Sequence, residues 1–384
     1  MMAYVLTKMT DIIEFNPRET IARKQVCKKV PMEYLQPFTQ QISGFEEAPY
    51  AGGTKFRNND TIMARITPCL ENGKTAFVKG FAENEVVFGS TEYIVMRAIP
   101  GASDPVFIYY LATSPSFREV AIKSMVGSSG RQRVQQDVLE NLELVLPDYE
   151  TQVRVGKVLS AFDDKIELNT QINHNLEEQA KAIFKSWFVD FEPFQDGTFV
   201  DSELGQIPAG WRTGTFGEIS RISSGKRPIK KSETKSADFM YPLIGASCVM
   251  GFTYDYLYDT PIIVTGRVGT HGIIQYFDEK CWPSDNTLVI QSDFLNFAYL
   301  YLQTIDFHSL NRGSTQPLIT QTDIKKQLCP IAPINILADF EDKLYASRAA
   351  IQNNLSQNQK LAQLRDALLP KLMSGEIDVS EVEV

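Results

Sequence analysis

VGKVLSAFDDKIELNTQINHNLEEQAKAIFKSW, residues 155–187, is the stretch that decides how this chain folds. Steps of four and three residues, taken alternately from Val155 to Trp187, meet ten positions, and eight of them are apolar. The residues between them are mostly charged or carry amides, which is typical of the a/d seam of a coiled-coil helix. The pattern predicts a helix from about Glu150 to Phe188. The seam residues that we expect to pack against a second helix are Leu159, Phe162, Ile166, Asn169, Asn173, Leu176 and Ile183.

A second copy of this seam lies 185 residues further along the chain, from Phe340 to Leu372. Ser347 and Arg365 interrupt it as polar residues. The two helices are expected to bury their seams against each other as an antiparallel coiled coil. In the second copy the predicted interface residues are Leu344, Ile351, Asn354, Asn358, Leu361 and Leu368.

Two asparagines fall at matching seam positions in each copy, Asn169 and Asn173 in the first and Asn354 and Asn358 in the second. Polar seam residues lower stability but fix the register and orientation of paired helices. In an antiparallel pair the helix midpoints meet, so we expect these four amides to hydrogen-bond at the crossing. The alternative is that the asparagines are tolerated beside solvent.

The segments before the helices also repeat. Gly127-Ser128-Ser129, Asp137 and Pro147 return 186 positions later as Gly313-Ser314-Thr315, Asp323 and Pro333. Short β-branched segments such as 61–66 and 261–268 lie between turn residues, and the helix-like segment 107–111 is echoed by 297–301. The chain therefore consists of an α+β module followed by a long helix, twice over.

The two modules share a layout but differ in content. Residues 88–93 align with 282–287, and Arg65 aligns with Arg267, yet the sequences between these anchors barely agree. Two similar scaffolds with different surface loops are suited to recognise two different targets.

Composition restricts the class of protein. No run of the 384 residues approaches the apolar length of a membrane span, and residues 1–10 lack the features of a signal peptide, so we expect a cytoplasmic protein. The five cysteines form no CxxC pair and are expected to be reduced core thiols rather than zinc ligands. The net charge of −9 lies largely on the two helical segments. The modules are near neutral, so total charge does not argue against DNA binding.

A specific resemblance follows from the ordered motifs. Gly-Ser-Thr-Glu-Tyr (89–93), Gly-Ser-Ser-Gly-Arg-Gln-Arg-Val (127–134) and Leu146-Pro147 precede the first helix. Ile-Pro-Ala-Gly-Trp (207–211) opens the second module, and Leu-Leu-Pro-Lys-Leu-Met-Ser-Gly-Glu-Ile (368–377) ends the second helix. Over essentially its whole length the chain resembles the specificity subunit of a type I restriction-modification enzyme.

This resemblance implies a DNA-recognition protein rather than an enzyme. Residues 1–149 and 201–333 would be two target recognition domains, each reading one half of a bipartite, asymmetric sequence in double-stranded DNA. Residues 150–200 and 334–384 would be helical spacers that set the spacing and dock modification subunits. The implied fold is α+β, a pseudo-two-fold repeat with an antiparallel coiled coil.

The resemblance also implies partners. They would be two adenine-specific DNA methyltransferase subunits, binding S-adenosylmethionine, and a restriction/translocase subunit that uses ATP and Mg. No cofactor is expected on this chain and no membrane partner. The alternative function is a two-module coiled-coil scaffold that binds protein or another polymer.

Most candidate DNA contacts are basic or amide side chains, because Lys and Arg bind phosphates and Arg and Gln pair with guanine and adenine edges. Ser128 and Thr315 are included because Gly-Ser segments let the backbone approach phosphate closely. Arg65 and Arg267 have an alternative role as anchors of an acidic neighbour of their own strand. In the second copy the loop has Gln316-Pro317-Leu318 where the first has Arg131-Gln132-Arg133, so a basic contact there is in doubt. The candidates are Lys55, Arg57, Arg65, Ser128, Arg131, Gln132, Arg133, Lys226, Arg227, Lys230, Lys231, Arg267, Thr315 and Gln316.

Catalytic motifs are weak. The sequence has no Asn/Asp-Pro-Pro-aromatic motif of an adenine methyltransferase. Pro147-Asp148 followed by Asp163-Asp164-Lys165 imitates a metal-dependent nuclease pattern, but its second half falls within the heptad helix and the other copy has Pro333-Ile334. Metal-assisted hydrolysis needs carboxylates that converge on an ion, and we therefore expect no catalytic residues.

Overall fold

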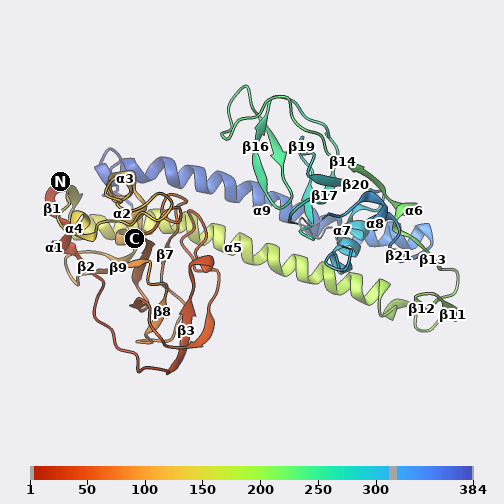
Figure 1. Ribbon diagram of the computed structural model, residues 1–384, viewed down its shortest axis with the longest axis horizontal. Coiled ribbons are helices and arrows are strands. Elements are labelled where there is room, and N and C mark those ends of the chain that lie inside the picture. The colour runs from red at the N-terminus through yellow and green to blue at the C-terminus, as the bar shows by residue number, and fades with distance from the viewer. Residues whose placement is uncertain (1–3, 271, 311–317, 383–384) are drawn as a thin grey trace. The chain divides into compact units, whose positions relative to one another are not determined.

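The computed structural model describes residues 4–270, 272–310 and 318–382. The chain divides into two compact units. Unit 1 combines Met1–Gln171 with Asn354–Val384, and unit 2 is the continuous segment Ile172–Asn353. Two long helices, α5 (Tyr149–Phe188) and α9 (Ile334–Ser374), each contribute one part to unit 1 and the other part to unit 2 (Figure 1).

Unit 1 contains an antiparallel four-stranded sheet in the order β2-β9-β6-β7, a mixed sheet in the order β4-β3-β8-β5, and a two-stranded sheet, β1-β10. Its strands are β1 (Tyr4–Lys8), β2 (Ile13–Phe15), β3 (Val26–Val30), β4 (Glu46–Pro49), β5 (Lys55–Phe56), β6 (Asp60–Ala64), β7 (Thr75–Phe77), β8 (Val87–Gly89), β9 (Tyr93–Ala98) and β10 (Glu143–Pro147). Its shorter helices are α1 (Met9–Ile12), η1 (Met32–Tyr34), α2 (Pro105–Thr113), α3 (Pro115–Lys123) and α4 (Gln136–Glu140).

Unit 2 contains the corresponding sheets β14-β20-β17-β18, β16-β15-β19 and β13-β21, and a hairpin of β11 and β12. Its strands are β11 (Phe199–Ser202), β12 (Gly205–Pro208), β13 (Arg212–Thr215), β14 (Arg221–Ser224), β15 (Tyr241–Ile244), β16 (Val249–Thr253), β17 (Ile262–Gly266), β18 (Gln275–Phe277), β19 (Trp282–Pro283), β20 (Thr287–Gln291) and β21 (Leu328–Ile331). Its shorter helices are η2 (Glu192–Phe194), α6 (Phe216–Ile219), α7 (Leu295–Thr304) and α8 (Gln321–Lys325).

The internal repeat predicted from the sequence is present in the strand order. In the mixed sheets, β3 pairs with β8 and β15 pairs with β19, and both pairs are parallel. Phe88 lies opposite Lys29 in one pair, and Trp282 lies opposite Leu243 in the other. The predicted alignment of Phe88 with Trp282 is therefore the structural one.

The long helices run antiparallel within each unit. In unit 1, Asn169 Nδ2 donates to Asn358 Oδ1 over 2.8 Å and to Gln357 Oε1 over 2.7 Å. In unit 2, Asn173 Nδ2 donates to the carbonyl of Ile351 over 3.4 Å. The residue numbers rise on α5 as they fall on α9 in each unit, because Asp163 pairs with Arg365 in unit 1 and Phe184 packs with Phe340 in unit 2. This is the antiparallel direction, and Asn169 and Asn173 are both buried.

The predicted seam residues of both helices are all buried or half-buried. The heptad pattern alone does not predict that residues of α5 beside the seam are buried as well. Phe184 and Phe188, each one position after a seam residue, pack with Phe297 of α7 in the core of unit 2. A second apolar stripe of α5 therefore supports the module, beside the stripe that faces the other helix.

Candidate nucleic-acid interface

Arg65 lies where three segments of unit 1 meet. It follows β6 directly, and its backbone N–H donates to the carbonyl of Glu92 over 2.9 Å. Its own carbonyl accepts from the N–H of Val134 over 2.9 Å. The residue is half-buried, and its Nε is buried without a hydrogen-bond partner among the described residues. The Arg65 backbone thus ties the end of β6 to the turn before β9 and to the end of the Gly-Ser loop.

Arg267 has the same position in unit 2. Its N–H donates to the carbonyl of Asn286 over 2.8 Å, and its carbonyl accepts from the N–H of Ile319 over 3.0 Å. Arg267 thus makes the same two backbone hydrogen bonds as Arg65. One joins it to the residue just before β20, the counterpart of β9, and the other joins it to Ile319, which takes the place of Val134. The predicted alignment of Arg65 with Arg267 therefore describes equivalent backbone sites, and Thr315 and Gln316 of the adjoining loop lie outside the described residues.

Arg133 closes the Gly-Ser loop of unit 1 through an acidic partner. Its Nη2 lies 2.6 Å from Glu92 Oε1, and its Nε donates to both carboxylate oxygens of Glu92. These hydrogen bonds hold the pKa of Glu92 below its ordinary value. Arg133 is thereby occupied, while Ser128 and Arg131 at the loop tip are exposed and Gln132 is half-buried.

The loop tip depends on Gly127. This residue has a φ of +135°, and a Cβ there would lie 3.0 Å from the carbonyl oxygen of Arg131. A side chain would be strained by the backbone conformation and would press against the loop. The glycine that marked this motif in the sequence therefore keeps Arg131 at the exposed tip.

Lys55 and Arg57 lie on and beside β5, and both are half-buried. The Lys55 ammonium sits 5.4 Å from the centre of the Tyr50 ring, and Arg57 Nε lies 3.5 Å from Glu19 Oε1. Glu19 also binds Arg97 at 2.8 Å. Both predicted contacts thus have internal partners, although neither side chain is fully enclosed.

The acidic neighbour proposed as an alternative partner of Arg65 is engaged elsewhere. The buried carboxylate of Asp60 accepts two hydrogen bonds from the Arg97 guanidinium, each 2.7 Å long. Asp60, at the start of the strand that Arg65 follows, thus pairs with Arg97 rather than with Arg65.

Arg18 was missed by the sequence reasoning. It is exposed and lines a hollow of about 420 Å³ together with Gly53 and Lys55. Its segment joins β2 to β3 and corresponds to the segment between β14 and β15, which carries the basic loop of unit 2. The repeat, extended to this connection, would have identified Arg18.

The basic loop of unit 2, residues 226–231, is fixed at both ends. The N–H of Lys226 donates to the carbonyl of Pro283 over 2.9 Å, and the Lys226 carbonyl accepts from Trp282 Nε1 over 2.7 Å. Just beyond the other end, Ser232 and Phe252 exchange two backbone hydrogen bonds of 2.9 and 2.8 Å.

The four cations of this basic loop are exposed: Lys226, Arg227, Lys230 and Lys231. Arg227 Nε has only a distant acidic neighbour, Asp285 at 3.9 Å. Among the described residues Lys230 and Lys231 have no ion-pair partner. Arg267 is half-buried. The loop is therefore held in place while its charges remain available.

One carboxylate of the nuclease-like pattern, that of Asp163, is engaged in the core of unit 1. Asp163 is buried, accepts a hydrogen bond of 2.6 Å from the Tyr110 hydroxyl, and forms an ion pair with Arg365. Within the described ranges, no three His, Cys, Asp or Glu side chains lie together in a way that would hold a metal ion. Of the five thiols, Cys281 and Cys329 are buried but Cys248 is exposed, so the expectation of core thiols is wrong for Cys248.

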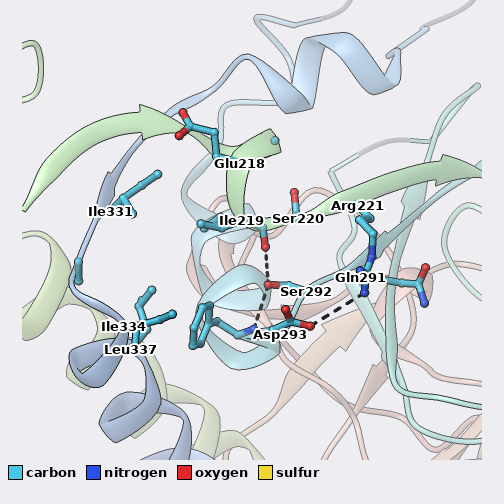
Figure 2. Close-up of a pocket in the computed structure, with 13 residues that line it drawn as sticks. Glu218, Ile219, Ser220, Arg221, Gln291, Ser292, Asp293, Ile331, Ile334 and Leu337 are labelled. Carbon is cyan, nitrogen blue, oxygen red and sulfur yellow. Dashed lines mark hydrogen bonds and ion pairs between the residues drawn. The ribbon is translucent and has the colours of Figure 1, made fainter.

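A hollow of about 500 Å³ in unit 2 lies at the start of α9 (Figure 2). The hydroxyls that line it are engaged with backbone carbonyls: Ser220 Oγ donates to Phe216 and Ser292 Oγ to Ile219, each over 2.7 Å. Asp293 faces Arg221 across 4.0 Å. Both serine hydroxyls of this hollow therefore donate to backbone carbonyls rather than to a side chain that could act as a general base.

No helix among the described residues is both long and apolar enough to cross a membrane.

Comparisons with known proteins match this architecture. The model of a family described as the type I restriction modification DNA specificity domain matches residues 3–178 and 208–361. The MjaIX specificity subunit of a type I restriction enzyme from Methanocaldococcus jannaschii is 30% identical over 302 residues, covering 72% of this chain and 70% of the relative. The HindI specificity subunit from Haemophilus influenzae is 25% identical over 419 aligned positions, covering 88% and 90%.

A solved structure shares the fold. The S subunit of a type I restriction-modification system from M. genitalium superposes with a TM-score of 0.58, covering 97% of this chain and 96% of that one. At 15% sequence identity this likeness concerns the fold alone.

Proposed function

Since the chain belongs to the family of type I restriction-modification DNA specificity domains, we propose that it selects the DNA sequence on which such an enzyme acts. Each module reads one half of a bipartite, asymmetric target in double-stranded DNA. The family match does not favour the alternative, a scaffold for protein or another polymer.

The observation that carries this proposal is the matched backbone at Arg65 and Arg267 beside unmatched loops. Equivalent hydrogen bonds fix both arginines in the same frame. Other parts of the two modules differ: Glu92, which binds Arg133, aligns with Asn286, and the connection 225–240 that carries the basic loop is longer than its counterpart 16–25. Lys and Arg on phosphates supply affinity, while side chains that reach base edges supply specificity. A common frame with different loops is suited to two different half-sites.

The long helices supply the spacing in this proposal. α5 has 40 residues and α9 has 41, and at about 1.5 Å per residue each is on the order of 60 Å long. One turn of DNA is about 34 Å, so helices of this length are on the scale of two separated half-sites. We expect an insertion or deletion in both helices to change the number of base pairs between the halves.

Catalysis belongs to partners in this proposal. Two adenine-specific methyltransferase subunits would dock on the chain and bind S-adenosylmethionine, and a restriction/translocase subunit would use ATP and Mg. The engaged serines of the hollow and the paired Asp163 support a chain that recognises DNA without chemistry of its own. Because the target is cellular DNA, this proposal also places the chain in the cytoplasm, as expected from the sequence.

Sequencing of DNA methylation in cells with and without this chain tests the proposal. The expected result is a bipartite methylated-adenine motif that disappears when the chain is absent. Exchange of residues 201–333 for the second module of another family member should change only one half of that motif, and exchange of residues 1–149 only the other half. A scaffold without DNA specificity would leave the methylation pattern unchanged in every strain.

A further inference from the structure

Ile229 is an apolar side chain at the centre of the basic loop. It is 79% exposed, the highest value among the large hydrophobic side chains of the described residues. Single exposed hydrophobic residues are common on protein surfaces. Ile229 differs because Arg227 lies two positions before it and Lys230 follows it directly.

The loop is built to keep Ile229 outside the core. The bonds of Lys226 with Trp282 and Pro283 hold its start, and the Ser232–Phe252 pair lies just beyond its end. That pair requires Gly251, because a Cβ at this position would lie 2.4 Å from the Ser232 carbonyl oxygen. A loop free to collapse would bury its isoleucine, whereas this one is fastened on either side of an exposed isoleucine.

The first module has no counterpart. The connection between β2 and β3 covers residues 16–25, whereas the one between β14 and β15 covers residues 225–240. The isoleucine of the shorter connection, Ile21, is only 9% exposed and belongs to the core. Between these two corresponding connections, only that of the second module thus carries an exposed isoleucine among cations.

The charge around Ile229 indicates the occupant. Residues 225–240 contain five Lys or Arg and two acidic residues, so the surface favours a polyanion over an apolar protein surface. In the major groove of DNA the 5-methyl group of thymine is the apolar feature that distinguishes this base, and apolar side chains contact it. The lysines on either side are then placed to reach phosphates.

We propose that Ile229 contacts the 5-methyl group of a thymine in the half-site read by the second module. This inference rests on the proposed function. It adds a specificity contact that hydrogen-bonding side chains of the same loop do not supply.

Deoxyuridine substitution tests the contact, because uracil lacks only the methyl group. The assembled complex with its methyltransferase subunits is titrated with duplexes that carry the target identified from methylation sequencing. Each thymine of the second half-site is replaced in turn by deoxyuridine. At one position the wild-type complex should lose about fourfold in affinity, as expected for one buried methyl group. The Ile229→Ala complex should bind the thymine and deoxyuridine duplexes equally.

Two control variants separate this contact from other effects. Lys230→Ala should weaken binding but keep the fourfold preference for thymine, because it removes a phosphate contact. Val200→Ala, at an exposed apolar residue of β11, should change neither affinity nor preference.

Three results would overturn the proposal: no thymine in that half-site, a wild-type complex indifferent to every deoxyuridine, or an undiminished preference in Ile229→Ala. Failure of the proposed function looks different, since the wild-type complex would then not bind the bipartite duplex above a scrambled one.

Discussion

The two units attach their modules to the long helices with opposite charges. In unit 1 one residue of α5 that contacts the module is the buried Asp163, bound to Tyr110 of α2 and to Arg365 of α9. The equivalent position in unit 2, 185 residues later, is Arg348 of α9. The fold is therefore repeated while the chemistry of the attachment is not.

Arg348 is held by aromatic rings. Its guanidinium lies 4.3 Å from the centre of the Tyr299 ring and 4.7 Å from that of Tyr276. Cations favour the faces of aromatic rings, most strongly where water is excluded. At this equivalent position the module of unit 1 is therefore contacted by an acidic residue and the module of unit 2 by a basic one.

The N-termini of α2 in unit 1 and α7 in unit 2 are also capped differently. In unit 1 the module caps its own helix, because Asp104 accepts from the N–H of Phe107 at the start of α2 over 2.9 Å. In unit 2 the cap comes from α9, where Glu341 accepts from the N–H groups of Asn296 and Phe297 over 3.0 and 2.8 Å. The long helix thus supplies in one unit what the module supplies in the other.

Arg365→Met gives the largest expected effect and breaks the attachment in unit 1 only. It leaves Asp163 buried without its cation, and removal of one partner of a buried pair costs about 3–5 kcal/mol. Hydrogen exchange should show faster opening of α2 and of the first part of α5. Exchange in α7 should stay unchanged.

Lys371→Ala is the matched control for Arg365→Met. Lys371 lies on the same helix and forms an exposed pair with Glu376, and such pairs contribute little. Equal protection in both variants would contradict a specific role for the Asp163–Arg365 pair.

Lys230→Ala with Lys231→Ala tests the difference between the recognition surfaces. Both side chains are exposed in the basic loop. We expect weaker binding to all DNA sequences, because the lysines reach phosphates rather than bases. In a salt titration the slope of log affinity against log salt should fall by about one for each lysine. An unchanged slope would contradict their role.

Glu341→Ala breaks the cap of α7 and concerns unit 2 only. The loss of a helix cap costs about 1 kcal/mol, and Arg348 loses a nearby acidic group as well. Hydrogen exchange should quicken at Asn296 and Phe297 while α2 keeps its protection. Asp104→Ala is the reciprocal variant and should quicken exchange in α2 alone.

The seam could be predicted because heptad spacing depends on local periodicity, and its residues are buried or half-buried in the structure. The role of Arg365 could not be predicted. It interrupts the seam as a polar residue, and only the fold places Asp163 beside it. The same limit applies to Phe184 and Phe188, whose burial depends on the module that α7 belongs to.

The candidate DNA-binding loops could likewise be predicted only in part. Glycines and clustered cations identified the loops at 127–133 and 226–231, since these signals are local. The sequence did not distinguish the cation that is engaged, Arg133, from Arg131, which is exposed at the tip. The exposure of the Ile229 side chain could not be predicted, because it depends on how the two ends of the loop are held.

Glu92→Gln gives the smallest expected effect and sharpens the comparison of the two recognition loops. In unit 1 the carboxylate of Glu92 holds Arg133, whereas the cations of the basic loop in unit 2 have no such close partner. Removal of this negative charge frees Arg133 for phosphate, so DNA affinity at low salt should rise. The salt slope should steepen by up to about one. If Arg133 already contacts DNA through its exposed edge, the slope will stay constant, and Arg133→Ala will then weaken binding in the wild-type background.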